Sequence, residues 1–83
     1  MKRDEILRQA EILINGDRAA DYGDAKENFK NIADLWSVYL GTPVNRQDVA
    51  VCMILVKAAR LMGSNKPDSW IDICGYAALG GEK

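Results

Sequence analysis

The sequence predicts an all-α fold, a single four-helix antiparallel domain that spans residues 1–83. Apolar residues recur at spacings of three and four along four segments, which is typical of helices with one buried face. Breaks marked by glycine, proline or both separate these segments. No segment alternates apolar and polar residues over a length typical of a strand. Since the connectors are short, consecutive helices are expected to run antiparallel.

The first two helices are expected over residues 3–14 and 24–40. Asn15-Gly16 ends the first helix. In the second, Asp24 is a suitable N-cap and Glu27 follows it three residues later, as in a capping box. Gly41 ends this helix, and Pro43 prevents its resumption. One face of it carries an apolar stripe that we expect in the core: Phe29, Ile32, Ala33, Trp36, Tyr39 and Leu40.

The last two helices are expected over residues 46–62, after the cap residue Asn45, and 67–79, with Pro67 in the first turn. Between residues 49 and 62 only Lys57 and Arg60 are charged. A helix that is apolar nearly all round is predicted to lie at the centre of the domain. The helices over residues 46–62 and 67–79 are both apolar on several faces, and one short chain offers too few partners to cover them. We therefore also expect a homodimer formed through these two helices.

Composition excludes several classes of protein. Eleven basic and twelve acidic residues give a net charge of −1, so direct nucleic-acid binding is not expected. The chain contains no histidine, which argues against a zinc site and against an activated cysteine nucleophile. Cys52 and Cys74 lie in apolar helical runs and are expected to be reduced and buried. With no secretory signal and no apolar run long enough for a bilayer, a soluble cytoplasmic protein is expected.

A polar cluster between the last two helices is the strongest functional signal. In an antiparallel hairpin, residues whose numbers have a constant sum face each other, so Lys57 should face Asp72 and Arg60 should face Asp68. One interpretation is a pair of structural ion pairs that fix the register. The other is a site whose cations bind phosphate and whose carboxylates bind Mg²⁺. We weigh the two equally, and the mid-helix Gly75, which would admit a close approach, slightly favours the second.

Two tyrosines and an asparagine complete the set of candidate ligand-binding residues. Tyr76 lies at the edge of the charged strip on the fourth helix. Tyr22, followed by Asn28, could present a phenol and an amide to a ligand. A turn that leads into a capped helix is the more common meaning of such a pattern and is favoured by the sequence alone.

The chain resembles a family of small phage and prophage proteins of unknown function. The resemblance covers most of the chain after about residue 18 and rests on an ordered series of residues: Tyr22-Gly23-Asp24, Glu27-Asn28-Phe29, Ile32-Ala33, Trp36, Tyr39-Leu40, Asp48-Val49, Lys57, Arg60, Asp68, Asp72 and Gly75-Tyr76. The pattern from Lys57 onward is also similar to nucleotide-modification-associated domains of phage genomes. More distantly, it resembles the all-α nucleoside triphosphate pyrophosphohydrolases of the MazG type.

Those pyrophosphohydrolases are helical dimers that hold Mg²⁺ through Glu-x-x-Glu on one helix and Glu-x-x-Asp on the next. Here the second helix offers Glu27 and Asp34, and the third has no acidic residue after Asp48. Only Asp68 and Asp72 match one half of that metal site. The resemblance therefore implies retained nucleotide binding in a degenerate or accessory enzyme, and whether hydrolysis occurs stays open.

Together these features predict a phage-encoded dimer that binds a nucleotide or another phosphate ligand. Lys57 and Arg60 would hold phosphate, Asp68 and Asp72 would hold Mg²⁺ or the base and sugar, and Tyr22 or Tyr76 would stack on the ligand. The alternative is a non-enzymatic phage protein that binds and inhibits a host defence protein. Solvent access distinguishes them, because a ligand site opens to a cleft whereas a structural network is buried and paired within itself.

Overall fold

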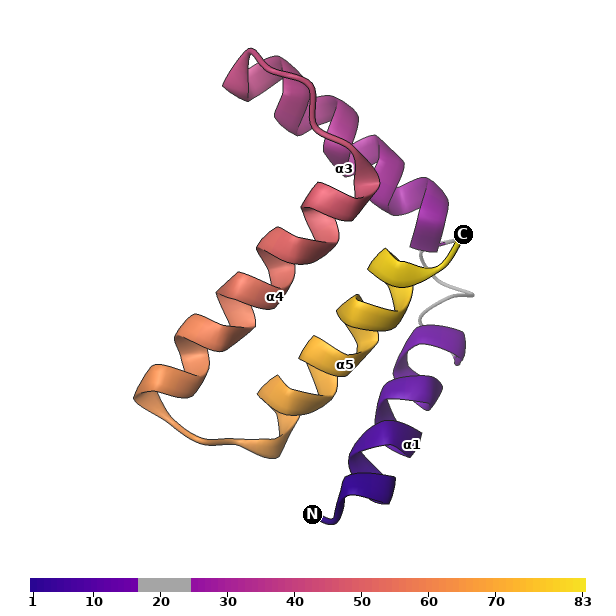
Figure 1. Cartoon of the computed structure of the whole chain (residues 1–83), viewed down its shortest axis with the longest axis vertical. Helices are drawn as coiled ribbons and strands as arrows, with labels where there is room; N and C mark the ends of the chain where they lie inside the picture. The colour runs from indigo at the N-terminus through magenta and orange to yellow at the C-terminus, as the bar shows by residue number, and fades with distance from the viewer. Residues whose placement is uncertain (17–24) are drawn as a thin grey trace.

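The computed structural model describes residues 1–16 and 25–83, and within these ranges it contains four α-helices and no β-strand. The helices are α1 (Arg3–Asn15), α3 (Ala25–Leu40), α4 (Arg46–Gly63) and α5 (Pro67–Gly81), as labelled in Figure 1. The all-α prediction is confirmed, and the predicted ends of the helices agree with the observed ones to within two residues.

The helices do not form the expected antiparallel four-helix unit. As Figure 1 shows, α5 lies between α4 and α1, and α3 crosses near the start of α4 and the end of α5. The helices α4 and α5 are antiparallel, as predicted, but α1 runs in the same direction as α5. The prediction that the third helix is central was also wrong, because the middle position belongs to α5 and α4 lies at one side.

Local signals explain where α3 ends and α4 begins. Gly41 has a φ of 68°, a left-handed conformation that glycine adopts without strain, and it ends α3. The Ser37 hydroxyl accepts a hydrogen bond from the Val44 amide (2.8 Å), which ties the connector to α3. Asn45 caps α4 in a capping box with Asp48, with backbone-to-side-chain distances of 2.9 and 3.0 Å. The expected cap residue Asp24 lies outside the described residues.

The end of α5 differs from the prediction because its two final glycines remain helical. A Cβ on Gly80 would lie 2.7 Å from the Ala50 Cβ, so α4 and α5 approach closely here. Arg46 donates hydrogen bonds to free carbonyl groups at this end of α5. Its guanidinium donates to the Leu79 carbonyl at 3.2 Å and to the Glu82 carbonyl at 2.8 Å.

A small core forms where α3 crosses α4. Its buried members are Phe29, Ala33, Val49 and Ala50, and partly buried apolar side chains pack around them: Ile32, Trp36, Val44, Met53, Tyr76 and Leu79. On the other side of α5, a Cβ on Gly75 would lie 3.1 Å from Ile14 Cγ2. The mid-helix glycine therefore admits a close approach, as expected, and the group that approaches is a side chain of α1.

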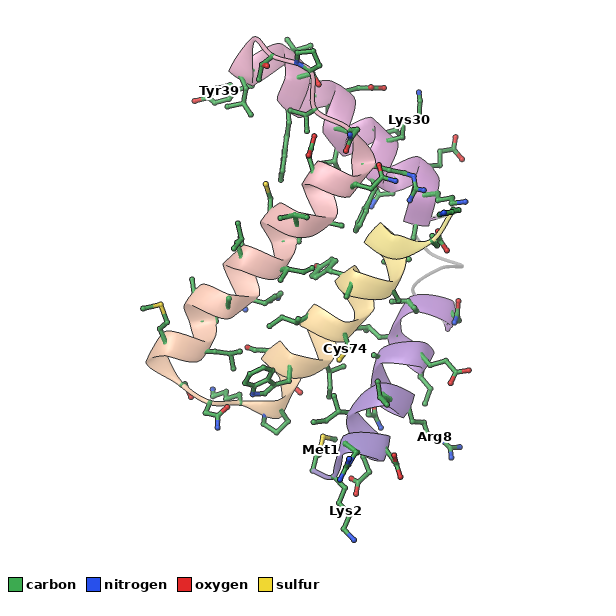
Figure 2. The ribbon with its side chains drawn as sticks, in the orientation of Figure 1. Met1, Lys2, Arg8, Lys30, Tyr39 and Cys74 are labelled. Atoms are coloured by element: carbon green, nitrogen blue, oxygen red, sulfur yellow. The ribbon has the colours of Figure 1, made fainter. Side chains whose placement is uncertain are left out.

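Several residues expected inside lie outside. Tyr39 is 90% exposed, and Figure 2 shows it near the end of α3, projecting away from the other helices. Leu40 is also exposed. The final turns of α3 extend past the crossing with α4, so no helix covers them. Cys52 is exposed rather than buried, because it lies on the uncovered face of α4, whereas Cys74 is half-buried; both are free thiols.

None of the four described helices combines the length and the apolar character that a membrane span would need.

Candidate functional site

A cleft of about 400 Å³ lies between α1, α4 and α5. Its volume falls within the range of small-molecule sites. The antiparallel α4–α5 pair supplies one wall and α1, packed against α5, supplies the other. Four of the candidate residues line this cleft, together with four further residues that complete the walls: Lys57, Asp68, Asp72 and Tyr76, with Gln9, Ile12, Leu13 and Ile71.

An ion pair joins the two helices of the α4–α5 hairpin inside this cleft. Lys57 Nζ lies 3.0 Å from Asp72 Oδ2, so the predicted facing of these residues is confirmed. The two side chains are only 14% and 26% exposed. By contrast, the Lys30–Asp34 pair on α3 is wider, 3.5 Å, and its side chains are 72% and 64% exposed. Because shielding from water strengthens a charge pair, Lys57–Asp72 is the more strongly coupled of the two.

The pair leaves part of the Asp72 carboxylate available. Among the described residues, Lys57 is the partner recorded for Asp72, through one carboxylate oxygen. In the same part of the chain, no side-chain polar atom is both buried and unpartnered. The Asp72 side chain is still 26% exposed, and it belongs to a residue that lines the cleft. The pair is thus a structural link and also part of the cleft surface.

Asp68 adds a second carboxylate one helical turn before Asp72. It is exposed, lines the cleft and lies in the first turn of α5. Residues four apart lie on the same face of a helix, so the two carboxylates share one side of α5. A carboxylate in a first turn is also stabilised by the helix dipole, which gives Asp68 a structural role without any ligand.

The predicted contact between Arg60 and Asp68 is not formed. The described residues contain no ion pair between them within 4.0 Å, and both side chains are exposed. Three residues along a helix amount to about 300° of rotation, so Arg60 is turned by about 60° from Lys57. Arg60 is also absent from the residues that line the cleft. The register of the α4–α5 hairpin was predicted correctly. Because Arg60 lies at a different angle around the axis of α4, however, the cleft receives one of the two predicted cations, Lys57.

Tyr76 reaches the cleft from the core. Its ring lies against Phe29 of α3, with 6.0 Å between the ring centroids and an angle of 28° between the rings. The residue is half-buried, and it both lines the cleft and packs against the core cluster. Since one face of the ring already meets Phe29, a bound ligand would find the remaining surface of the phenol and its hydroxyl group.

The other two candidates lie elsewhere. Asn28 is exposed on α3 and does not line the cleft, so the structure does not bring it together with the other candidate residues there. Tyr22 lies outside the described residues. No group of three or more cysteine, aspartate or glutamate side chains in residues 1–16 and 25–83 is arranged to hold a metal ion. A metal at this cleft would have Asp68 and Asp72 as its carboxylate ligands.

The α1 wall of the cleft was missed by sequence reasoning. Gln9, Ile12 and Leu13 all come from this helix, and Gln9 brings an amide to a cleft whose other polar groups are charged or phenolic. The signal was Gly75, because a glycine in the middle of a helix marks a place where another element can approach closely. Had the approaching element been identified as α1, its side chains could have been placed.

Residues 5–83 match a protein family described as a domain of unknown function, DUF6378. The chain is 53% identical over 76 residues to the Gene 55 protein of Mycobacterium phage L5 and 47% identical over 75 residues to the Gene 55 protein of Mycobacterium phage D29. These alignments cover 89% of this chain and 49% and 50% of the two relatives, so the chain spans about half the length of the curated relatives it matches. No solved structure matches. The predicted likeness to phage proteins of unknown function is confirmed.

Proposed function

This chain belongs to the DUF6378 family, and from that premise we propose that it is a phage-encoded protein that binds a small phosphorylated ligand of the nucleotide class, with Mg²⁺, in the cleft between α1, α4 and α5. The observation that carries the proposal is the Lys57–Asp72 pair, which is shielded from water and yet lines a cleft that also contains Asp68 and Tyr76. A structural link alone needs no adjoining cleft.

The charges of the cleft determine how such a ligand would bind. One cation, Lys57, stands against two carboxylates, Asp68 and Asp72, so the lining carries a net negative charge. A bare phosphate would meet repulsion here. Mg²⁺ is bound in proteins by one or two carboxylates together with phosphate oxygens and water, and these two carboxylates fit that pattern. Mg²⁺ would therefore neutralise the carboxylates and make a phosphate group acceptable.

Each side chain then has a specific role. Lys57 would donate a charge-assisted hydrogen bond to a phosphate oxygen while it keeps Asp72 in place. The Gln9 amide and the Tyr76 hydroxyl would hydrogen-bond the sugar or the base, and the apolar side chains of Ile12 and Leu13 would cover one face of it. The finer version of this proposal is a degenerate or accessory enzyme related to MazG-type pyrophosphohydrolases, in which binding is retained. No hydrolytic step is assigned to these residues.

A thermal-shift screen tests the proposal. The probes are Mg²⁺ alone, inorganic phosphate, and each of the four deoxynucleoside triphosphates and monophosphates with and without Mg²⁺. We expect stabilisation by a nucleotide only when Mg²⁺ is present, since a ligand at a hundredfold excess over its Kd stabilises by about 2.7 kcal/mol. Equal melting temperatures across the whole panel would defeat the proposal.

A substitution of Asp68 separates binding from folding. Asp68 is exposed and has no side-chain partner among the described residues, so Asp68→Asn should cost the free protein only the interaction with the helix dipole, about 0.3–1 kcal/mol. It should remove most of the Mg²⁺-dependent stabilisation. Asp34→Asn, at an exposed carboxylate on α3 outside the cleft, is the matched control and should respond to the ligand like the wild type.

One observation favours the alternative function, which is the binding and inhibition of a host protein. The outer face of α4 and the end of α3 expose large apolar side chains, as a docking surface would. A surface that is already covered by a second copy of the chain would not be available to a host protein. The test in the next subsection therefore bears on this alternative as well.

A further inference from the structure

From Cys52 to Met62, the face of α4 that points away from the core and the cleft is apolar, and one turn earlier the same face begins with the capping-box residue Asp48. We define the outer strip of α4 as Cys52, Leu55, Ala59 and Met62, all of which are exposed, with Met62 at 91%. None of these four residues is charged. On the opposite side of the same helix, Val49, Ala50 and Met53 face the core, and Lys57 faces the cleft.

The spacing of the outer strip is that of a helix-packing seam. Its residues follow one another at intervals of three, four and three, the pattern of a and d positions in a coiled coil. Such a seam remains on one face over three turns and therefore fits another helix that crosses at a shallow angle. The partner that this surface requires is accordingly an apolar helix.

The strip is complementary to itself when two copies run antiparallel. Leu55 then faces Ala59 of the second copy, and Cys52 faces Met62 of the second copy, because both pairs of residue numbers add to the same value. Each contact thus sets a large side chain against a small one, which is the arrangement that lets two helices pack closely. A two-fold axis repeats both contacts, as a symmetric dimer requires.

We propose that a second copy of this chain covers the outer strip, with α4 packed antiparallel against α4 of the second copy about a two-fold axis. A standard interface buries about 800 Å² per partner. The exposed apolar surface available for such a contact comes from the strip, from its neighbours Val51 and Val56, and from the exposed residues of α3. The exposed residues of α3 are Leu35, Val38 and Tyr39.

The dimer does not depend on the proposed function. Lys57 lies about 160–200° around the helix from Leu55 and Ala59, so a partner on the outer strip leaves the cleft open. A host protein or a membrane surface would gain nothing from the match of large and small residues within the strip. That match is specific to a second copy.

Sedimentation velocity and light scattering test the assembly. The wild type should have twice the 9.2 kDa mass of one chain at micromolar concentration. Leu55→Asp should weaken the dimer by about 100-fold or more, since symmetry introduces the charge twice into the buried centre of an interface. Leu7→Asp on α1 is a matched control, because Leu7 is 60% exposed and Leu55 61%, and it should remain dimeric. A monomeric wild type, or a Leu55→Asp variant that remains dimeric, would overturn the proposal.

Cross-linking tests the direction of packing on a Cys74→Ser background, with copper–phenanthroline as oxidant. In the antiparallel arrangement, Met62→Cys should form a disulfide-linked dimer with the native Cys52 of the second copy. Met62→Cys combined with Cys52→Ser should lose that dimer. If Cys52 without a second cysteine cross-links efficiently to itself, the helices are parallel and the proposed packing is wrong.

Discussion

The charges of Lys57 and Asp72 are largely shielded from water, and yet both side chains line a cleft. Shielding makes each charge depend on the other, since an unpaired charge in such surroundings loses hydration without compensation. At the same time, the cleft gives a ligand access to the carboxylate. The two residues are therefore expected to affect both stability and binding, and only a comparison of substitutions can separate the two effects.

We predict that Lys57→Met lowers the free energy of unfolding by about 2 kcal/mol, between the small contribution of an exposed pair and the loss on breaking a buried one. Urea denaturation measures this value. Lys30→Met, which breaks the exposed Lys30–Asp34 pair, is the matched control and should cost about 0.5 kcal/mol or less. If both substitutions cost the same, the Lys57–Asp72 pair is not shielded as described.

Asp72→Asn and its combination with Lys57→Met complete a double-mutant cycle. Once the carboxylate has lost its charge, removal of the lysine charge should cost less, so the double variant should be more stable than the sum of the single losses implies. Strict additivity of the two losses in the same urea experiment would mean that the ion pair contributes no coupling.

The Lys57–Asp72 contact could be predicted from the sequence because an antiparallel hairpin fixes which residues face each other. The same rule failed for Arg60 and Asp68, since it gives the level along the helices but not the rotation of each side chain around its axis. Tyr39 was misplaced for a related reason. Its spacing puts it near the apolar stripe of α3, but the helix extends beyond the elements that could cover it.

Among the helices, the close contact between α4 and α5 depends on a glycine, Gly80, which has no side chain. A Cβ on Gly80 would meet Ala50 Cβ at 2.7 Å, and a Cβ cannot rotate away. Overpacking of this kind costs about 1–3 kcal/mol, of which the better helix propensity of alanine returns up to about 1 kcal/mol. We therefore predict that Gly80→Ala lowers the free energy of unfolding by about 1–2 kcal/mol.

The adjacent glycine provides the control for that substitution. A Cβ on Gly81 would meet nothing within 4 Å, so Gly81→Ala should be neutral or slightly stabilising. Thermal or urea denaturation of the two variants side by side checks the contrast. A Gly80→Ala protein as stable as Gly81→Ala would show that α4 and α5 do not approach as closely as the structure places them.

Arg46 of α4 holds the end of α5 through two backbone carbonyls, at 3.2 and 2.8 Å. Arg46→Met keeps most of the apolar stem and removes both hydrogen bonds. We predict a loss of about 1 kcal/mol and faster hydrogen exchange of the amides in the last turn of α5, because its carbonyls lose their partners. Lys66→Met, at the exposed start of the same helix, should leave that exchange unchanged.

Helix positions could be predicted well because glycine, proline and asparagine mark the ends of helices through local geometry, as at Gly41, Asn45 and Pro67. The packing order could not. The nearly uniform apolar character of α4 suggested a central helix, but apolar residues show only that a surface should be covered, not by which chain. The central position belongs to α5, whose Gly75 and Gly80 admit close approaches from α1 and α4.

At the scale of the whole molecule, the buried core is small for the number of apolar side chains. Among the described residues, six hydrophobic ones are buried, whereas twelve large hydrophobic ones remain exposed. A domain of this size gains limited stability from one core, so association is a natural supplement. The cleft and the outer strip of α4 lie on different faces of that helix, so the proposed ligand site and the proposed dimer interface do not overlap.

The cleft between α1, α4 and α5 is proposed to bind a nucleotide with Mg²⁺. An NMR titration of the ¹⁵N-labelled protein with a deoxynucleoside triphosphate and Mg²⁺ gives the clearest test of this binding, because every backbone amide reports its own surroundings. The predicted result is a set of amide shift changes around Gln9, Lys57, Asp68, Asp72 and Tyr76 that disappears when Mg²⁺ is omitted. Shift changes confined to the outer strip of α4, or none at millimolar ligand, would contradict the claim.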